Sequence, residues 1–316
     1  MDALDTSLQA SPARTLDFRA GLFRLADPKI TLASAAGIFL AAAASASAGP
    51  LAWGWLAVVV AGVFAIETAK NASGEIFDWD SGTDQAIAPA DRTPFSGGKR
   101  VLVDGLLTRR QTAAIAVVGY SLALGAGLLV AWLREPRVLG LGILGLAGAW
   151  FYHAPPIQLS YRGWGEAAVA LCYGPLLVAG TFLTLRQDLS WEVVALSIPL
   201  ALLVGAFLWV NELPDASADA ASGKRTLVVR LGRARAIRVF AALLAVPLAL
   251  LLVLPLLGLP WPVLGGMIAA PAAARAAKAA LAAEETQQLI PAQVATLLAF
   301  LLYAAGAGLG LLVSPS

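Results

Sequence analysis

The sequence predicts an all-α integral membrane protein with about nine transmembrane helices, and its composition is the first reason. Hydrophobic residues occupy 59% of the 316 positions and charged residues only 13%. Soluble domains contain roughly half apolar and about a quarter charged residues. One soluble core could not bury this much apolar surface, whereas lipid can cover it.

Apolar runs of the right length are the second reason. A helix needs about 20 mainly apolar residues to cross the hydrocarbon layer. Such runs lie near residues 30–48, 51–70, 113–133, 138–153, 167–185, 193–210, 239–258, 260–281 and 289–313. The run at 138–153 is short, and 239–281 can also be divided so that the total is eight.

The distribution of basic residues is the third reason. With nine spans, alternate loops share one side of the membrane, and 19 of the 22 Lys and Arg residues then fall on one side. The other side holds Arg134, Arg137 and Arg186. Positively charged loops remain in the cytoplasm. We therefore expect a multi-pass protein of the cytoplasmic membrane with its N-terminus inside and its C-terminus outside.

Residues 1–28 form the predicted cytoplasmic N-terminal segment, and residues 29–316 a single transmembrane domain. The N-terminal segment lacks the apolar core of a cleavable signal peptide. The one cysteine, Cys172, excludes an internal disulfide and a cysteine metal cluster, and we interpret it as packing. The one histidine, His153, cannot form a histidine metal site. Its position at a helix end allows it to line a site, but we interpret it as an interfacial, structural residue. Nothing indicates nucleic acid or an obligate protein partner.

Two long polar loops, about 71–112 and 211–236, resemble each other. Each begins with an asparagine followed by acids and then by basic residues, and Asn211 follows Asn71 by 140 residues, or four spans. This offset predicts two four-helix halves in the same orientation, at about 29–153 and 165–281, with a last helix at about 289–313. Paired repeats in membrane proteins commonly place the binding site between the halves.

The acidic residues of both loops are spaced for a metal site. Glu75 and Asp78 follow Asn71 at helical spacing, and so do the acids of the second loop, which places each set on one helix face. Such acids near a span need cations, and an all-oxygen ligand set indicates Mg²⁺. We call each of these sets of acidic and Asn side chains on one helix face an acidic stripe. Two facing acidic stripes suit a diphosphate bridged by two ions. The candidate ligands are Asn71, Glu75, Asp78, Asp84, Asn211, Asp215 and Asp219.

Basic residues follow each acidic stripe and are the candidates for contacting a diphosphate. They are Arg92, Lys99 and Arg100 after the first stripe, and Lys224 and Arg225 after the second. Cationic side chains at this place can neutralise diphosphate as it leaves. For each cluster alone, solvated loop charges are the alternative explanation. Just before Asn71, Glu67 and Lys70 are spaced three residues apart and are expected to pair with each other.

At these residues the sequence resembles the UbiA superfamily of membrane prenyltransferases, and most closely its 1,4-dihydroxy-2-naphthoate polyprenyltransferase branch. The first motif of that branch matches at Asn71, Glu75, Asp78, Gly82 and Asp84. The second matches at Asn211, Asp215, Asp219, Gly223, Lys224 and Thr226. A third, branch-specific stretch matches at Tyr152, Pro156, Arg162, Gly163, Gly165, Glu166, Gly174 and Pro175.

The sequence departs from the branch pattern at three positions. Gly74 stands where the family often has Asn, Glu75 where it usually has Asp, and Glu212 where a second Asn is common. Glu can still ligate Mg²⁺, but its longer side chain shifts the ion. The remaining acids, Asp78, Asp215 and Asp219, keep the pattern.

The resemblance implies nine helices around a central cavity that opens to the cytoplasm and to lipid, and Mg²⁺-dependent transfer of a polyprenyl group from a prenyl diphosphate to an aromatic acceptor of quinone biosynthesis. It implies catalytic roles for Asp78, Asp215, Lys224, Tyr152 and Tyr161. It implies substrate contacts from Arg92, Lys99, Arg100, Arg225, Arg162, Asn71 and Asn211. Tyrosine rings could stabilise an allylic cation, although Tyr also gathers at membrane interfaces for other reasons.

Two other classes of function remain open at this point. The departures in the first motif allow a terpene cyclase of the same fold, or a transferase with a non-quinone acceptor. The repeat and the acids near the membrane also allow a transporter or carrier of an anionic lipid. The basic residues beside each stripe favour catalysis over cation transport, because a cation path would avoid them.

Overall fold

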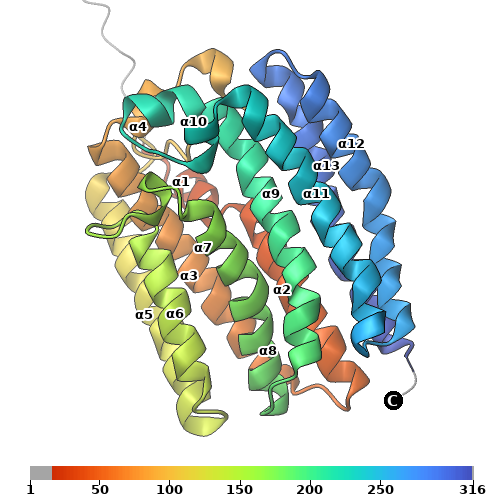
Figure 1. The fold of residues 1–316 in the computed structure, drawn as a ribbon. Coiled ribbons are helices and arrows are strands. Elements are labelled where there is room, and N and C mark those ends of the chain that lie inside the picture. Colours follow the sequence, from red (N-terminus) through yellow and green to blue (C-terminus); the bar gives the residue numbers. More distant parts are fainter. Residues whose placement is uncertain (1–15, 315–316) are drawn as a thin grey trace, which may run out of the picture.

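The structure is a computed structural model that describes residues 16–314 and shows a bundle of helices without strands in that range (Figure 1). The long helices are α2 (Pro28–Ser47), α3 (Trp53–Asp80), α5 (Arg109–Leu133), α9 (Trp191–Ala221), α11 (Arg233–Val253) and α13 (Ile290–Leu312). The shorter ones are α1 (Phe18–Ala26), α4 (Thr83–Ala86), α6 (Val138–Phe151), α7 (Gly165–Leu171), α8 (Leu177–Arg186), α10 (Leu227–Leu231) and α12 (Ala270–Ala282). A π-helical turn, η3 (Cys172–Leu176), joins α7 to α8, and a 3₁₀ segment, η5 (Trp261–Ala269), runs into α12.

Seven helical segments within the described residues are long and apolar enough to cross a membrane. The helix α6 is apolar but has only 14 residues, and the segment η5–α12 is not among the seven. Both segments coincide with predicted spans. The predicted all-α membrane fold is therefore confirmed, while the count of nine stays a prediction.

The acidic stripes lie on helices that extend beyond their apolar parts. The predicted loops were expected from residues 71 and 211, but α3 continues to Asp80 and α9 to Ala221. That expectation was wrong because helical backbone hydrogen bonds persist where buried polar side chains find partners at the end of the bundle. Figure 1 shows α4 and α10, which follow these helices, at the same end of the bundle and opposite the C-terminus.

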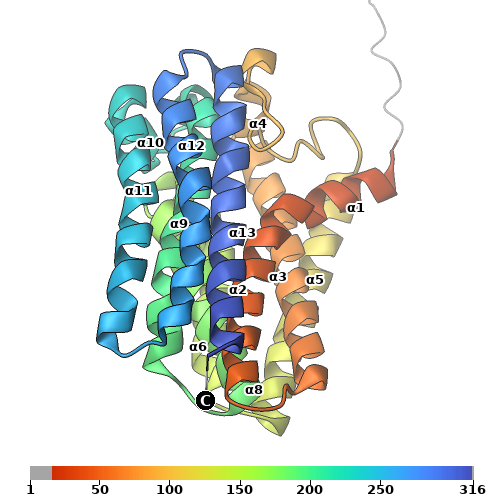
Figure 2. The same ribbon diagram turned by 90° about the vertical axis from the view of Figure 1, so that its right-hand side faces the viewer.

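The N-terminal part of the described chain is a short helix that the sequence did not predict. Asp17 caps α1 by accepting a hydrogen bond from the Ala20 backbone N–H. Figure 2 shows α1 lying obliquely to α2 near the end that carries α4. The predicted segment 1–28 is thus helical from Phe18 to Ala26, and its residues 1–15 lie outside the described residues.

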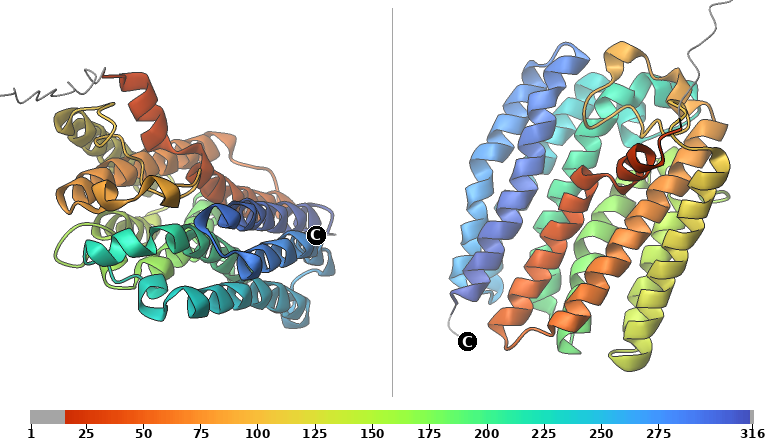
Figure 3. Two further views of the ribbon diagram at one scale, coloured as in Figure 1. Left: turned by 90° about the horizontal axis from the view of Figure 1, so that it is seen from above. Right: turned by 180° about the vertical axis from the view of Figure 1, so that it is seen from behind.

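Glycines allow α13 to pack directly against η5. A Cβ at Gly306 would lie 2.1 Å from the carbonyl oxygen of Gly265, and a Cβ at Gly310 would lie 1.9 Å from that of Pro262. Small residues allow such close approach between membrane helices. Figure 3 shows α13 next to α2 and α3 next to α5 on the rear face, which is consistent with their contacts.

The substitution Gly306→Leu is expected to destabilise the bundle, because its side chain would collide with backbone that cannot move independently. Overpacking of this kind lowers the free energy of unfolding by about 1–3 kcal/mol. Denaturant titration in mixed micelles measures the loss. Gly125→Leu is the matched control, since no atom lies within 4 Å of a Cβ at that position. Equal stability of the two variants would contradict the expected collision.

Candidate active site

The site forms where the ends of α3 and α9 meet. Gly223 adopts φ +82° after α9 and reverses the chain, so that the Lys224 backbone N–H donates to the Asp219 carbonyl, 2.8 Å away. This is a common way to end a helix. Thr226 then caps α10 through a hydrogen bond from the Val229 N–H to its hydroxyl. The local turn therefore aims Lys224 back over the end of α9.

Lys224 joins the two acidic stripes. Its Nζ lies 2.9 Å from Asp78 Oδ1 on α3 and 3.7 Å from Asp219 Oδ1 on α9. Burial acts to lower the pKa of the Lys224 ammonium, but the charges of Asp78 and Asp219 outweigh burial and raise that pKa above its ordinary value. Lys224 thus places a positive charge between carboxylates from the two helices of the predicted repeat.

Asp215 connects α9 to the segment after α4. Its Oδ2 accepts a hydrogen bond from the Gly97 backbone N–H at 3.1 Å. Its Oδ1 is buried without a hydrogen-bond partner, and so is Oδ1 of Asn211, one turn earlier on the helix. Buried polar atoms are almost always paired in proteins. Two unpaired oxygens on one helix face therefore indicate a place for a ligand that accepts electron pairs.

Asp84 adds a third acid to the same region. It is 3% exposed and packs onto Gly98, where a Cβ would lie 2.2 Å from Asp84 Oδ1. Burial, followed by the nearby charges of Asp78 and Glu75, raises the pKa of Asp84 to about 8. Burial and the neighbouring carboxylates therefore favour the neutral form of Asp84, and a bound cation would favour its charged form.

These residues fit a magnesium ion shared with a ligand. In the described part of the chain, no three acidic, histidine or cysteine side chains gather closely enough to hold a metal by themselves. Mg²⁺ usually takes only one or two protein carboxylates and completes its ligands from water and phosphate. The unpaired oxygens of Asn211 and Asp215 are donors of that kind, and the Asp84 carboxyl group is a third one.

Glu75 and Asn71 have structural contacts in addition to their predicted metal roles. Glu75 Oε1 accepts a hydrogen bond from the Leu102 backbone N–H at 2.7 Å, which leaves its buried Oε2 unpaired. The Asn71 amide donates to the Leu25 carbonyl at 2.8 Å and thereby attaches α1 to α3. One oxygen of each residue remains for a ligand role.

Tyr161 belongs to the cluster directly, and Tyr152 lies beside it. The Tyr161 hydroxyl donates to Asp78 Oδ1 at 3.1 Å, and Lys224 Nζ lies 5.2 Å from the centre of the Tyr161 ring. Tyr152 makes an edge contact with His153 at 4.8 Å between ring centres. Lys70 Nζ lies 5.1 Å from the centre of the Tyr152 ring. Two aromatic faces are therefore present next to the charged groups.

The structure divides the predicted basic contacts into two groups. Lys99 pairs with Asp27, and Arg100 Nη1 donates to the Asp84 carbonyl at 3.0 Å, so both lie at the acidic region. Arg92 is part-buried near Gly97, and its buried Nε has no partner.

Arg162 and Arg225 form the second group, and both are exposed. Arg162 Nη2 donates to the Pro156 carbonyl at 2.9 Å, and the Arg225 backbone N–H donates to the Tyr161 carbonyl at 3.0 Å. The structure therefore does not bring their side chains to the cluster. Glu166 anchors the loop after α9, since its Oε1 accepts a hydrogen bond from the Leu227 N–H at 2.7 Å.

Sequence reasoning undervalued His153. Its imidazole occupies the space beside Gly74, where a Cβ would lie 2.6 Å from Cε1, and its Nε2 lies 3.6 Å from Asp78 Oδ2. Gly74 departs from the family pattern, and its lack of a side chain leaves the space that the His153 imidazole occupies. Positions 74 and 153 are 79 residues apart, and a single sequence does not show that two such distant residues are in contact.

The substitution Gly74→Ala is expected to destabilise the protein by about 1–3 kcal/mol, because the new methyl group collides with the imidazole. Adding His153→Ala removes the collision, so the double variant should lose less stability than the two single losses combined. Unfolding free energies of the four proteins form a double-mutant cycle. Additive losses would show that residues 74 and 153 do not compete for the same space.

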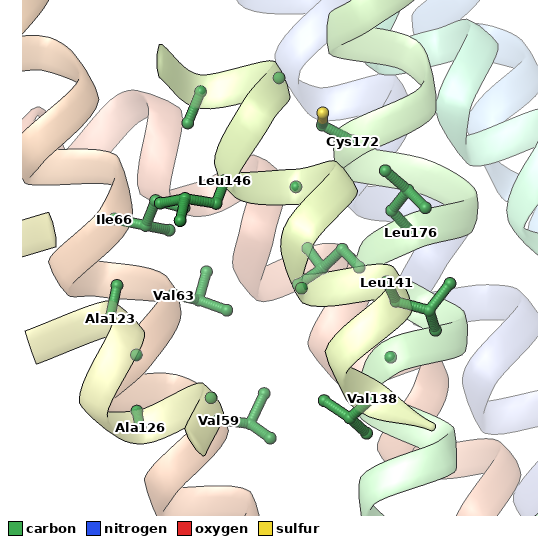
Figure 4. A pocket seen from close by; sticks show the side chains of 18 of the residues that line it. Val59, Val63, Ile66, Ala123, Ala126, Val138, Leu141, Leu146, Cys172 and Leu176 are labelled. Carbon is green, nitrogen blue, oxygen red and sulfur yellow. The ribbon is translucent and has the colours of Figure 1, made fainter. Parts of the chain in front are cut away.

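An apolar pocket of about 290 Å³ extends from Tyr152 and Lys70 into the membrane region between α3, α5, α6 and η3–α8 (Figure 4). Its lining on α3 runs from Val58 to Lys70, which corresponds to about 18 Å of helix. Figure 4 shows Val63, Leu141 and Leu176 pointing into it. The cavity is suited to a long hydrocarbon chain.

The fold and this arrangement of polar groups over an apolar pocket define a class of membrane enzyme that handles a substrate with a charged head and a hydrocarbon tail. Residues 35–291 match the model of the UbiA prenyltransferase family. The chain belongs to that family and is a membrane prenyltransferase.

Curated relatives and solved structures agree with this assignment. The 1,4-dihydroxy-2-naphthoate octaprenyltransferase of Mycobacterium tuberculosis is 36% identical over 79% of this chain and 80% of its own length. A UbiA homolog from Aeropyrum pernix K1 has a TM-score of 0.66 at 18% identity, covering 92% of this chain and 98% of that one. A homolog from Archaeoglobus fulgidus, solved with GPP and Mg²⁺, has a TM-score of 0.62 at 14% identity, covering 91% and 99%.

Proposed function

We propose that this protein transfers a polyprenyl group from a prenyl diphosphate to 1,4-dihydroxy-2-naphthoate or a similar quinone precursor, as a Mg²⁺-dependent step of menaquinone-type biosynthesis. The observation that carries the proposal is the position of Lys224 between Asp78 and Asp219. The cluster lies at the loop end of the bundle, and the apolar pocket runs from Tyr152 and Lys70 into the membrane region. The naphthoate octaprenyltransferase relatives support the acceptor.

The polar end of the site is suited to hold the diphosphate. Asp78, Asp84, Asn211 and Asp215 would hold Mg²⁺, which when bound supplies positive charge against the diphosphate. Lys224 donates hydrogen bonds to the diphosphate oxygens and stabilises the charge that develops as the group leaves. Lys99, Arg100 and Arg92 surround the same region from the loop after α4 and contribute further positive potential.

The apolar end of the site holds the hydrocarbon and the reacting carbon. When the allylic C–O bond breaks, its electron pair leaves with the diphosphate, and an allylic cation remains. The rings of Tyr152 and Tyr161 stabilise that cation through their electron-rich faces. The acceptor ring then forms the new C–C bond, and for a naphthoate acceptor the ring carboxyl group leaves as CO₂. The α3–α6 pocket keeps the tail out of water.

The proposal includes the placement of the site at the cytoplasmic face. Both polar clusters lie at the end of the bundle opposite the C-terminus (Figure 1). That end carries most of the basic residues, and basic loops remain in the cytoplasm. Water-soluble diphosphate would then be released to the cytoplasm.

The decisive experiment incubates purified protein in nanodiscs with geranylgeranyl and longer prenyl diphosphates and a panel of aromatic acids. We expect a prenylated product that has lost one carboxyl group, formed only when Mg²⁺ and the naphthoate are both present, and EDTA should stop its formation. Product mass gives acceptor and chain length together. Diphosphate release without acceptor, giving a cyclic hydrocarbon, would instead establish a terpene cyclase. No turnover with any acceptor would overturn transferase activity.

A further inference from the structure

A lysine lies inside the apolar pocket, away from the diphosphate cluster. Lys70 lines the cavity together with Glu67, Tyr152 and Tyr173, while the remaining lining is mainly aliphatic. Charged side chains within membrane spans are costly and usually mark a substrate path or a partner. The proposed transfer mechanism assigns Lys70 no role.

Lys70 has no carboxylate partner among the described residues, since no acidic oxygen lies within 4.0 Å of its Nζ. The expected pair with Glu67 is therefore not formed. Other cations pair with the nearby aspartates: Asp27 with Lys99 and Lys29, and Asp78 with Lys224. Glu67 Oε1 accepts a hydrogen bond from Ser34, and its buried Oε2 has no hydrogen-bond partner. The described contact of Lys70 is the Tyr152 ring, 5.1 Å from its Nζ. An ammonium held only by an aromatic face can accept an anion.

The distance along α3 separates this cation from the diphosphate. Lys70 precedes Asp78 by eight residues, which is about 12 Å of helix. An anion bound by Lys70 would lie beside the Tyr152 ring and the aliphatic lining of the pocket. This environment is suited to an aromatic carboxylate and unsuited to a doubly charged, hydrated diphosphate.

We infer that Lys70 binds the carboxylate of the aromatic acceptor, whose ring packs against Tyr152. The inference rests on the proposed function and adds to it the residue that selects acidic over neutral acceptors. Tyr152 then has two contacts, one with the ammonium and one with the acceptor ring. The positive charge of Lys70 offsets the carboxylate charge, which would otherwise be costly in the apolar pocket.

Direct binding tests the inference without any turnover. The probes are 2-naphthoate and its neutral isostere 2-naphthamide, titrated calorimetrically into full-length protein in nanodiscs, with empty nanodiscs as the blank. Wild type should bind naphthoate about tenfold or more tightly than naphthamide, as expected for a charge-assisted hydrogen bond. Lys70→Met should remove this preference, and Lys70→Arg should retain most of it. Lys278→Met makes the same change at an exposed position of α12 and should leave the preference intact.

Three results would overturn the inference. The first is equal affinity of wild type for the two probes, which needs no variant and therefore holds even if Lys70→Met fails to fold. The second is an unchanged preference in folded Lys70→Met. The third is weaker binding of inorganic diphosphate with Mg²⁺ in Lys70→Met while naphthoate binding is unaffected. Failure of the proposed function would look different, because naphthoate would bind through Lys70 and yet no prenylated product would form.

Discussion

Replacing Lys224 by methionine is expected to remove nearly all prenyl transfer and to destabilise the protein at the same time. Asp78 and Asp219 would remain as part-buried carboxylates without their shared cation, and leaving such charges unpaired costs about 3–5 kcal/mol. Turnover should fall by about 100-fold or more, because a donor aimed at the developing charge is lost. Initial rates of product formation and denaturant titration measure the two effects.

Two comparisons separate the charge of Lys224 from its bulk. Lys224→Arg retains the cation and should retain most of the stability. In Lys224→Met, added Mg²⁺ should raise the unfolding temperature by more than it does in wild type, because the two carboxylates then have no other cation. A Lys224→Met protein as stable and as active as wild type would show that the cluster needs no cation from the chain.

Replacing Asp215 by asparagine is expected to reduce turnover by about 100-fold or more while leaving stability nearly unchanged. The new amide oxygen can still accept the hydrogen bond from Gly97, and one carboxylate fewer reduces the repulsion at Asp84 and Asp219. The negative charge that attracts the metal is lost, so half-maximal rate should require a higher Mg²⁺ concentration. Rates measured over a Mg²⁺ series, together with unfolding curves, give both quantities.

The two variants are informative as a pair because only Lys224→Met is expected to lose stability. Asp188→Asn is the matched control for Asp215→Asn, since it makes the same change at an exposed position after α8 and should alter neither quantity. A normal Mg²⁺ dependence in Asp215→Asn would remove Asp215 from the proposed ligands. A loss of stability as large as that of Lys224→Met would indicate a structural role instead.

Local properties of the chain predict much of the fold. Apolar length predicts membrane spans because the thickness of the hydrocarbon layer sets it, and the described helices lie where the runs lie. Helical spacing of Asn71, Glu75 and Asp78 predicted one face of one helix, and α3 carries all three. The repeat at Asn211 predicted a second face of the same kind, which α9 carries.

Pairings between distant residues could not be predicted in this way. Lys224 was expected near the diphosphate, but its two carboxylate partners depend on how the end of α9 meets the end of α3. Arg162 and Arg225 have the same side-chain chemistry as Arg100, yet they are exposed while Arg100 reaches Asp84. The direction in which a loop places a side chain depends on tertiary contacts, which leave no periodic pattern in the sequence.

The sequence by itself determined the class of the protein. The length of apolar runs, the basic residues of each loop and the helical spacing of the acids are all local properties, each of which can be read from a short stretch of the chain. Tertiary structure alone decided that His153 fills the space at Gly74, that Lys70 is left without a carboxylate within 4.0 Å, and that an apolar pocket is lined by Lys70 and Tyr152. These features depend on which surfaces of separate helices meet, and packing determines that through the shapes of side chains far apart in the chain.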